Sequence, residues 1–442
     1  MVFKKGVLLL VVFMLFSISA YATVPNEESI NILDFGANGY DSIEDTDAIN
    51  NALEKAVKNN IKTVIVPKGE YIVSKTIDLP SNINLKGEEN SVIKFADNVN
   101  ANTILLRLKG GENNIISSLT FDGNVENLIK TDTPFRSEAL INQSNTSKKT
   151  TNVRIENCII KNTYSRGIRL VKAHIVVIEN NSFFNVGFDN LSILGESKDI
   201  KIANNNFEDG KSVAIKSYGG VSQISVTKNT INNFTHAGED SNNNWSIGIE
   251  FTNNINDITC TDNIVKNVGD IGISISKVNK ALCKSNDITN IVNGQNNGLG
   301  LEIVQSNNIT VIKNSITNSS MKNAIISRST NVIYKNNYSE LKEDAKGNKN
   351  IQHVEISSKQ NMVTKDCEIS NNTFKGGTRG ILGGKAMRID ITDNLFYNNF
   401  VAIDYGYYGG GENIRIAGND FEKNKESIRT KNMINLSYDI KK

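Results

Sequence analysis

The sequence predicts an all-β fold, a single parallel β-helix with one helix at its N-terminal end, and three observations carry this prediction. First, a short pattern recurs along the chain at spacings that mostly lie between 22 and 25 residues. Second, each repeat alternates apolar and polar residues, which is typical of strands and leaves no room for a long helix. Third, 67 of the 442 residues are asparagine, and many of them occupy one position of the repeat.

The first segment has the composition of a secretory signal peptide, which we place at residues 1–22. Lys4 and Lys5 precede the apolar run 7–16, and residues 20–22 read Ala-Tyr-Ala. A charged start, a short apolar stretch and small residues at the cleavage position are typical of such signals. The run is short for a membrane span, although an N-terminal membrane anchor is the alternative. We therefore expect a secreted or extracytoplasmic protein that does not span the membrane after cleavage.

Residues 23–95 are expected to form an N-terminal cap and the first coils, and residues 96–442 the β-helix repeats. Thr46 is placed to begin a helix as its N-cap, because apolar residues follow it at helical spacing up to Val57. The open end of a β-helix exposes strand edges and core, and a helix can cover both.

The repeat reads apolar, any, apolar, two mostly polar, Asn, any, apolar, as in Val176–Phe183 and Ile200–Phe207. At a tight corner, asparagine tolerates the left-handed backbone conformation. Stacked on itself, its amide can donate to the next coil and accept from the previous one. Insertions interrupt the spacing at 235–246, 291–298 and 341–350. The asparagines of the repeat are Asn181, Asn205, Asn229, Asn263, Asn286, Asn314, Asn337, Asn372, Asn394 and Asn419, with Cys158 and Leu119 at the equivalent earlier places.

The composition argues against two classes of function. Lys and Arg number 49 against 47 Asp and Glu, a net charge of +2. This balance disfavours a nucleic-acid partner that is bound by neutralising many phosphates. Only 3 His and 4 Cys are present, which leaves little room for a zinc site built on those ligands.

The four cysteines are predicted to be buried thiols rather than disulfides. The repeat places Cys260 and Cys283 at the same interior position of consecutive coils, and Cys367 also points inward. A Cys260–Cys283 disulfide is the alternative, because the separation of adjacent coils lies within the range of disulfide Cα distances.

Four motifs near the N-terminus follow one another in a characteristic order. They are Asp34–Ala37 (DFGA), Asp45–Ile49 (DTDAI), Pro67–Tyr71 (PKGEY) and Leu85–Gly87 (LKG). Over residues 29–95 the chain resembles the pectate-lyase-like superfamily, in its rhamnogalacturonase/epimerase-like branch. The resemblance implies a right-handed, single-stranded β-helix and an extracellular polysaccharide as ligand. It does not fix the reaction, because that superfamily includes lyases, hydrolases, epimerases and phage tailspikes.

The chain departs from the catalytic motifs of the best-known members of that superfamily. His174, His236 and His353 lack the flanking residues of the G-H-G segment of polygalacturonases. The D-P-H-D segment of alginate epimerases and the W-x-D-H segment of pectate lyases are also missing. No catalytic residue is therefore carried over from the resemblance.

Candidate site residues come instead from aligning the second strand of each coil. Glu250 and Glu302 would lie two coils, roughly 9–10 Å, apart, near the upper limit of roughly 6.5–9.5 Å for an inverting glycosidase. Glu302 and Glu355 have the same relation. An ordinary solvated face is the alternative, because it too would separate like charges by a neutral coil. The outward middle position of the strand reads Arg169, Ser192, Lys216, Glu250, Ser274, Glu302, Ile326, Glu355, Leu382 and Asp404.

Two further regions offer residues for binding sugars. The insertion 235–246 carries His236, Asp240 and the only tryptophan, Trp245. An indole in a polar loop beside a cleft can stack on a sugar ring, although it can also anchor the loop. Tyr405, just before a glycine run, can stack in the same way or simply close the last coils.

Three functions remain open on these residues. A glycoside hydrolase, the first choice because acids outnumber bases in the column, would use Glu250, Glu302 and Glu355. A lyase or epimerase of uronates would use Arg169 and Lys216, as the resemblance to β-helix lyases implies, and its acids could hold Ca²⁺. The third is a non-catalytic glycan-binding or cell-surface protein. In each case Asp404 is expected among the residues that contact the polysaccharide.

Overall fold

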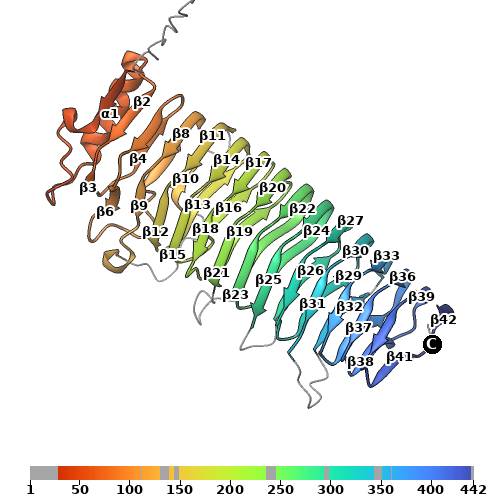
Figure 1. Ribbon diagram of the computed structural model, residues 1–442. Coiled ribbons are helices and arrows are strands. Elements are labelled where there is room, and N and C mark those ends of the chain that lie inside the picture. The colour runs from red at the N-terminus through yellow and green to blue at the C-terminus, as the bar shows by residue number, and fades with distance from the viewer. Residues whose placement is uncertain are drawn as a thin grey trace, which may run out of the picture.

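The protein is an elongated stack of β-coils, shown by a computed structural model (Figure 1). The structure describes residues 28–109, 111–129, 139–143, 149–234, 245–292, 298–342, 351–359 and 361–439. The signal peptide predicted at residues 1–22 lies outside them. Within them, no helix combines the length and apolar composition needed to cross a membrane.

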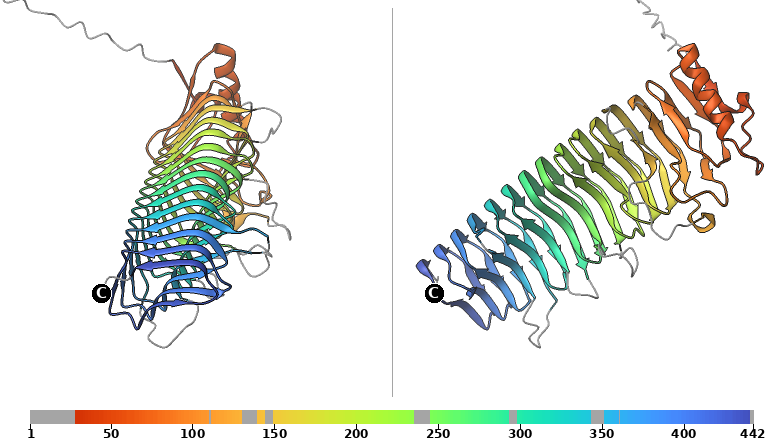
Figure 2. Two further views of the ribbon diagram at one scale, coloured as in Figure 1. Left: turned by 90° about the vertical axis from the view of Figure 1, so that its right-hand side faces the viewer. Right: turned by 180° about the vertical axis from the view of Figure 1, so that it is seen from behind.

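One α-helix, α1 (Thr46–Asn59), lies across the N-terminal end of the stack (Figure 2). Its buried residues Ile49, Ala52, Leu53 and Ala56 share one face and cover the first coils. The predicted cap is thus confirmed, but the N-cap is Asp45 rather than Thr46. A 3-10 helix (Ile32–Phe35) packs against α1, and a second one spans Val125–Asn127.

Each coil contributes three strands, and like strands of successive coils pair in parallel to form three faces. The β14 face contains β1 (Ser29–Asn31), β2 (Thr63–Val66), β5 (Asn84–Gly87), β8 (Glu112–Ser117), β11 (Thr150–Glu156), β14 (Ala173–Glu179), β17 (Lys198–Ala203), β20 (Ser222–Thr227), the later parts of β22 (Ile247–Thr261) and β24 (Ile271–Lys284), β27 (Asn307–Ile312), β30 (Thr330–Lys335), β33 (Thr364–Ser370), β36 (Ala386–Thr392), β39 (Glu412–Ala417) and β42 (Ile434–Asp439). The β15 face contains β3 (Gly69–Val73), β6 (Ser91–Phe95), β9 (Thr120–Asp122), β12 (Ile159–Thr163), β15 (Ser182–Val186), β18 (Asn206–Glu208), β21 (Thr230–Phe234), β23 (Ile264–Val268), β25 (Asp287–Ile291), β28 (Ser315–Thr317), β31 (Tyr338–Glu340), β34 (Thr373–Lys375), β37 (Leu395–Tyr397) and β40 (Asp420–Glu422). The β13 face contains β4 (Ile77–Pro80), β7 (Leu106–Lys109), β10 (Ala139–Asn142), β13 (Arg166–Val171), β16 (Leu191–Leu194), β19 (Val213–Tyr218), the first parts of β22 and β24, β26 (Leu299–Val304), β29 (Lys322–Ser327), β32 (Gln352–Ser357), β35 (Arg379–Gly384), β38 (Val401–Tyr408) and β41 (Glu426–Thr430).

The repeat asparagines form the predicted ladder inside one corner of the stack. Asn181 donates from Nδ2 to Asn205 Oδ1 of the next coil at 3.0 Å and to the Ile155 carbonyl of the previous coil at 2.9 Å. The Cys158 amide in turn donates to Asn181 Oδ1 at 2.9 Å. The same bonds recur from coil to coil up to Asn419. The asparagine excess is therefore a structural feature of the fold.

The ladder asparagines do not adopt the left-handed conformation, and that part of the prediction is wrong. The residue before each of them does: Asn180 has φ +58°, Asn204 +54° and Lys228 +56°. Two adjacent residues thus have different roles. The left-handed residue turns the corner, and the asparagine after it forms hydrogen bonds along the stack.

All four cysteines are free and buried, as predicted. Cys260 and Cys283 are partners in adjacent coils. Their contact, together with burial, raises the pKa of Cys260 well above its ordinary value. The alternative of a disulfide between them is not realised.

Candidate active site

A groove of about 550 Å³ runs along the β13 face, across the outward side of β19, β22, β24 and β26. Its walls combine titratable, hydroxyl, apolar and aromatic side chains. We call it the β13-face groove, and it is lined by Arg166, Phe188, Ser212, Val213, Lys216, Trp245, Ile247, Glu250, Thr252, Ile271, Ser274, Ser276 and Glu302.

Glu302 lies at one end of the groove and is held by Ser274. The Ser274 hydroxyl donates to Glu302 Oε2 at 2.7 Å. Burial raises the pKa of the Glu302 carboxyl, the Ser274 bond opposes this rise, and the nearby Glu250 adds to it. Glu302 therefore keeps its proton to a higher pH than an ordinary glutamic acid.

Glu250 lies on the other side of Ser274 and forms an ion pair with Lys216. The Lys216 Nζ is 3.0 Å from Glu250 Oε2. Burial lowers the pKa of Lys216, but the carboxylates of Asp189 and Glu250 outweigh it, so the net shift is upward. A lysine in this state stays charged at neutral pH and stabilises the carboxylate of Glu250.

Arg166 and Phe188 complete the N-terminal side of the groove, the buried Asp189 supports Arg166, and the sequence pattern identified none of the three. The Asp189 side chain is fully buried and accepts from Arg166 Nε at 3.0 Å and from the Ser212 hydroxyl at 3.2 Å. The Arg166 guanidinium lies 4.9 Å from the centre of the Phe188 ring. A row of alternating charges thus runs from Arg166 through Asp189 and Lys216 to Glu250.

These residues were missed because the strand alternation breaks at the corner that begins each strand of this face. Both Gly248 and Ile249 face the interior, since a Cβ on Gly248 would lie 2.5 Å from Val265 Cγ1 of the β15 face. Ile247 therefore faces outward and lines the groove together with Glu250. Strict alternation from Glu250 predicts that Gly248, two residues earlier, faces outward. Arg166 and Ile247 each precede the corner glycine of their coil, so the sequence pattern does not identify them as outward-facing residues.

The predicted column is correct except at one place. Register pairs Arg169, Ser192, Lys216, Glu250, Ser274 and Glu302 on successive coils as expected. The next member is Ile325 rather than Ile326, which is fully buried in the core. The predicted alignment is shifted by one residue here because Asn323 occupies the corner position at which the immediately preceding coils have glycine.

Four predicted site residues lie outside the β13-face groove. Glu355 is buried, 2.9 Å from Lys322 Nζ, and accepts from Gln352 at 2.7 Å. Asp404 is buried in an ion pair with Arg379 at 2.8 Å. Tyr405 is wrong as a sugar platform, because its ring is fully buried in the core.

Arg169 lies two coils before Lys216 in the same column and does not line the groove. Trp245, at 45% exposure, does line it, as the prediction of a sugar platform requires. His236 and Asp240 fall outside the described residues.

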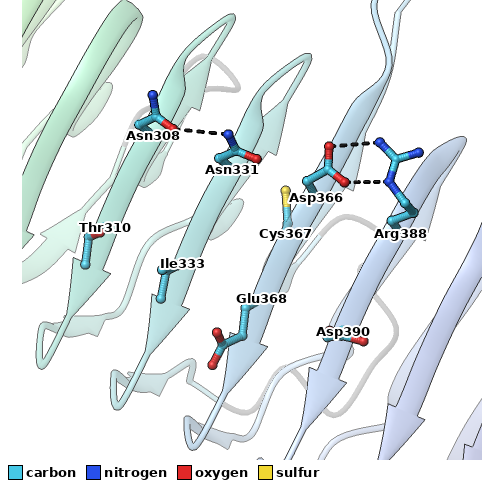
Figure 3. Close-up of a pocket in the computed structure, with 9 residues that line it drawn as sticks. All are labelled: Asn308, Thr310, Asn331, Ile333, Asp366, Cys367, Glu368, Arg388 and Asp390. Atoms are coloured by element: carbon cyan, nitrogen blue, oxygen red, sulfur yellow. Dashed lines mark hydrogen bonds and ion pairs between the residues drawn. The ribbon is translucent and has the colours of Figure 1, made fainter.

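A second hollow of about 570 Å³ lies on the β14 face, between β27 and β36 (Figure 3). One edge carries Asn308, Asn331, Asp366 and Arg388, all left-handed residues at the same place of successive coils. Arg388 donates to both carboxylate oxygens of Asp366, at 2.5 and 2.9 Å. This ion pair lowers the pKa of Asp366, which therefore does not suit the role of a proton donor, and the described residues that line this hollow include no aromatic ring. We therefore place the candidate site in the β13-face groove.

Within the described ranges, no three His, Cys, Asp or Glu side chains lie close enough together to hold a metal ion. Bound Ca²⁺ stays a prediction from the sequence.

Comparisons with known proteins agree with this architecture. Residues 29–250 match the family described as rhamnogalacturonase A/epimerase, pectate lyase-like. Residues 247–421 match the right-handed β-helix region. The two matches together cover the stack almost from end to end and give its handedness.

Sequence similarity to individual proteins is confined to about a fifth of the chain, whereas similarity in fold extends over most of it. The chain is 40% identical over 105 residues to the preneck appendage protein of Bacillus phage PZA, covering 22% of this chain and 12% of that protein. It is 37% identical over 110 residues to alginate lyase 7 of Azotobacter vinelandii, covering 22% and 13%. The mannuronan C-5 epimerase AlgE6 A-module of Azotobacter vinelandii superposes with a TM-score of 0.55 at 17% identity, covering 93% of this chain and all of the module. The chain thus matches about an eighth of the length of these curated relatives.

Proposed function

Because the chain belongs to the rhamnogalacturonase A/epimerase, pectate lyase-like family, we propose that it is a glycoside hydrolase acting on an extracellular polysaccharide. The predicted signal peptide supports action outside the cytoplasm. One observation carries the choice of hydrolysis: the β13-face groove contains two glutamates in different electrostatic environments, Glu302 and Glu250.

Glu302 is proposed as the general acid. Its raised pKa keeps the carboxyl protonated closer to neutral pH, as protonation of a leaving glycosidic oxygen requires. The Ser274 hydroxyl fixes its orientation by donating to one carboxyl oxygen. The other oxygen is then free of that bond and can carry the proton toward the substrate.

Glu250 is proposed as the general base. The ammonium of Lys216, 3.0 Å from one oxygen of the carboxylate, holds it in place to accept a proton from an attacking water. The two glutamates lie two coils apart, with Ser274 on the coil between them. This corresponds to roughly 9–10 Å between backbones, which leaves room for a water and supports inversion rather than retention.

Trp245 and Phe188 are proposed to bind the sugar chain. Trp245 is half-exposed at the groove, and Phe188 lines the same side. Aromatic rings offer the apolar faces of sugars a stacking surface.

Elimination or epimerisation of a uronate is less well supported by the same groove. Such a reaction needs a base, and the upward pKa shift of Lys216 makes a neutral lysine scarce at neutral pH. A non-catalytic role in binding glycan would need neither the raised pKa of Glu302 nor the paired Glu250.

Incubation with a panel of polysaccharides tests the proposal. We expect new reducing ends without the ultraviolet absorbance of an unsaturated sugar. Glu302→Gln and Glu250→Gln should each lower kcat by about 100-fold or more, and Glu340→Gln on the β15 face should not. Full activity in both groove variants would exclude the assignment, and an absorbing product would identify a lyase.

A further inference from the structure

The cations of the β13-face groove are already committed to carboxylates. Arg166 and Lys216 are the basic residues that line it. Arg166 is 3.0 Å from Asp189, and Lys216 is 3.0 Å from Glu250. With Glu302 protonated, as proposed above, the groove and its buried support hold two carboxylates, Asp189 and Glu250, that pair with these two cations.

Nearby residues do not reverse this balance. Arg328 lies close enough to Glu302 to oppose the rise of its pKa, but it does not line the groove. An incoming anion would therefore meet no unpaired cation among the described residues that line the groove.

The remaining groove surface suits an uncharged sugar. Val213, Ile247 and Ile271 of adjacent coils form a nearly buried apolar strip at the base of the groove. Ser212, Ser276 and Thr252 add hydroxyl groups, and the carboxylates can accept from sugar hydroxyls. Apolar strip, aromatic edge and hydroxyl-bonding groups are the contacts a neutral sugar ring uses.

We propose that the β13-face groove recognises a neutral polysaccharide chain, not a polyuronate. The inference rests on the proposed function, because it assigns the substrate class of the same site. Its physical basis is that Glu250 and Asp189 occupy the cations a sugar carboxylate would need. Binding a uronate would require breaking an ion pair or placing like charges together.

The test is binding of matched polymers to the Glu302→Gln variant, which keeps the groove but removes the proposed acid. Polygalacturonate, alginate and a glucuronan are compared with their carboxyl-reduced counterparts by affinity electrophoresis at low salt. We expect at least one reduced polymer to retard the protein, with an affinity about tenfold or more above that of its native form. Equal or tighter binding of the native form, or no binding of any reduced polymer, would overturn the proposal.

A second variant isolates the charge. Glu250→Gln should release Lys216 to bind a carboxylate, so affinity for the native polymer should rise by about tenfold while affinity for the reduced polymer changes little. An unchanged preference in this variant would contradict the reasoning. The outcomes separate the two proposals: if reduced polymers bind but the wild type releases no reducing ends from any polymer, hydrolysis fails and neutral recognition stands.

Discussion

Replacing one rung of the asparagine ladder, Asn286→Ala, should destabilise the protein by about 2–6 kcal/mol. Asn286 is buried, and its Oδ1 accepts from the Asn263 amide at 3.1 Å and from Asn263 Nδ2 at 2.9 Å. Its own Nδ2 donates to the Cys260 carbonyl and to Asn314 Oδ1, both at 2.9 Å. Alanine removes all four bonds and leaves two donors on Asn263 short of an acceptor. Each buried group without its partner costs about 1–3 kcal/mol, which gives the estimate.

The assay is urea unfolding followed by circular dichroism, with Asn256→Ala as the matched control. Asn256 is also a stacked asparagine, which accepts from Asn279 at 3.1 Å, but it is exposed to water. Its replacement should change the free energy of unfolding by less than about 0.5 kcal/mol. If Asn286→Ala is no more destabilising than Asn256→Ala, the buried ladder does not hold the coils together as described.

Three further predictions concern strain, pH and the site. Ile175→Asn should stabilise by about 1 kcal/mol in the same assay, because Ile175 is a β-branched residue at φ +55°; a loss of stability would contradict this. His353 is fully buried, and its pKa is lowered to about 4. Because the unfolded chain takes up a proton on this histidine at higher pH than the folded chain, the free energy of unfolding should fall as pH drops from about 6.5 toward 4, by about 2.5 kcal/mol at pH 4.5. His353→Gln should flatten this part of the stability profile, and the same pH dependence in wild type and variant would refute the prediction. Lys216→Met should lower kcat/KM by about tenfold or more, and Lys216→Arg should restore most of it, because the cation that holds Glu250 in place is lost and regained. Wild-type activity in Lys216→Met would exclude the role of this ion pair.

The fold could be predicted because the coils repeat, so that each copy of the sequence pattern supports the alignment of the other copies. The ladder from Asn181 to Asn419 could be aligned from sequence, and Cys158 and Leu119 do stand at the equivalent places. The predicted insertions fall between strands rather than within them. Spacing along the stack follows from backbone pairing, which does not depend on particular side chains.

The residues that line the candidate groove could be predicted only where strands keep their alternation. Glu250, Glu302 and Lys216 lie mid-strand and were found, whereas Arg166 and Asp189 lie beyond a corner that reverses the outward direction. Such a corner depends on tertiary packing, because Gly248 faces inward, where a Cβ would lie 2.5 Å from Val265 Cγ1 of the β15 face.

For Tyr405 the error is the opposite one, because here the alternation was correct and was not applied. Alternation from Asp404 already predicts that the next residue, Tyr405, faces the core. Gly383, its partner in the previous coil, leaves room for the ring, because a Cβ there would lie 2.1 Å from Tyr405 Cδ2. The ion pair of Lys322 with Glu355 could not be predicted from the sequence, because Lys322 lies at the corner position where the alternation breaks.

The most direct test of the account is release of reducing ends from the polysaccharide panel by wild type and by Glu302→Gln, measured side by side with absorbance of unsaturated sugar. We expect release by the wild type without that absorbance, and a loss of about 100-fold or more in the variant. Equal release by both proteins would contradict it, because the β13-face groove would then not be where the glycosidic bond is cleaved.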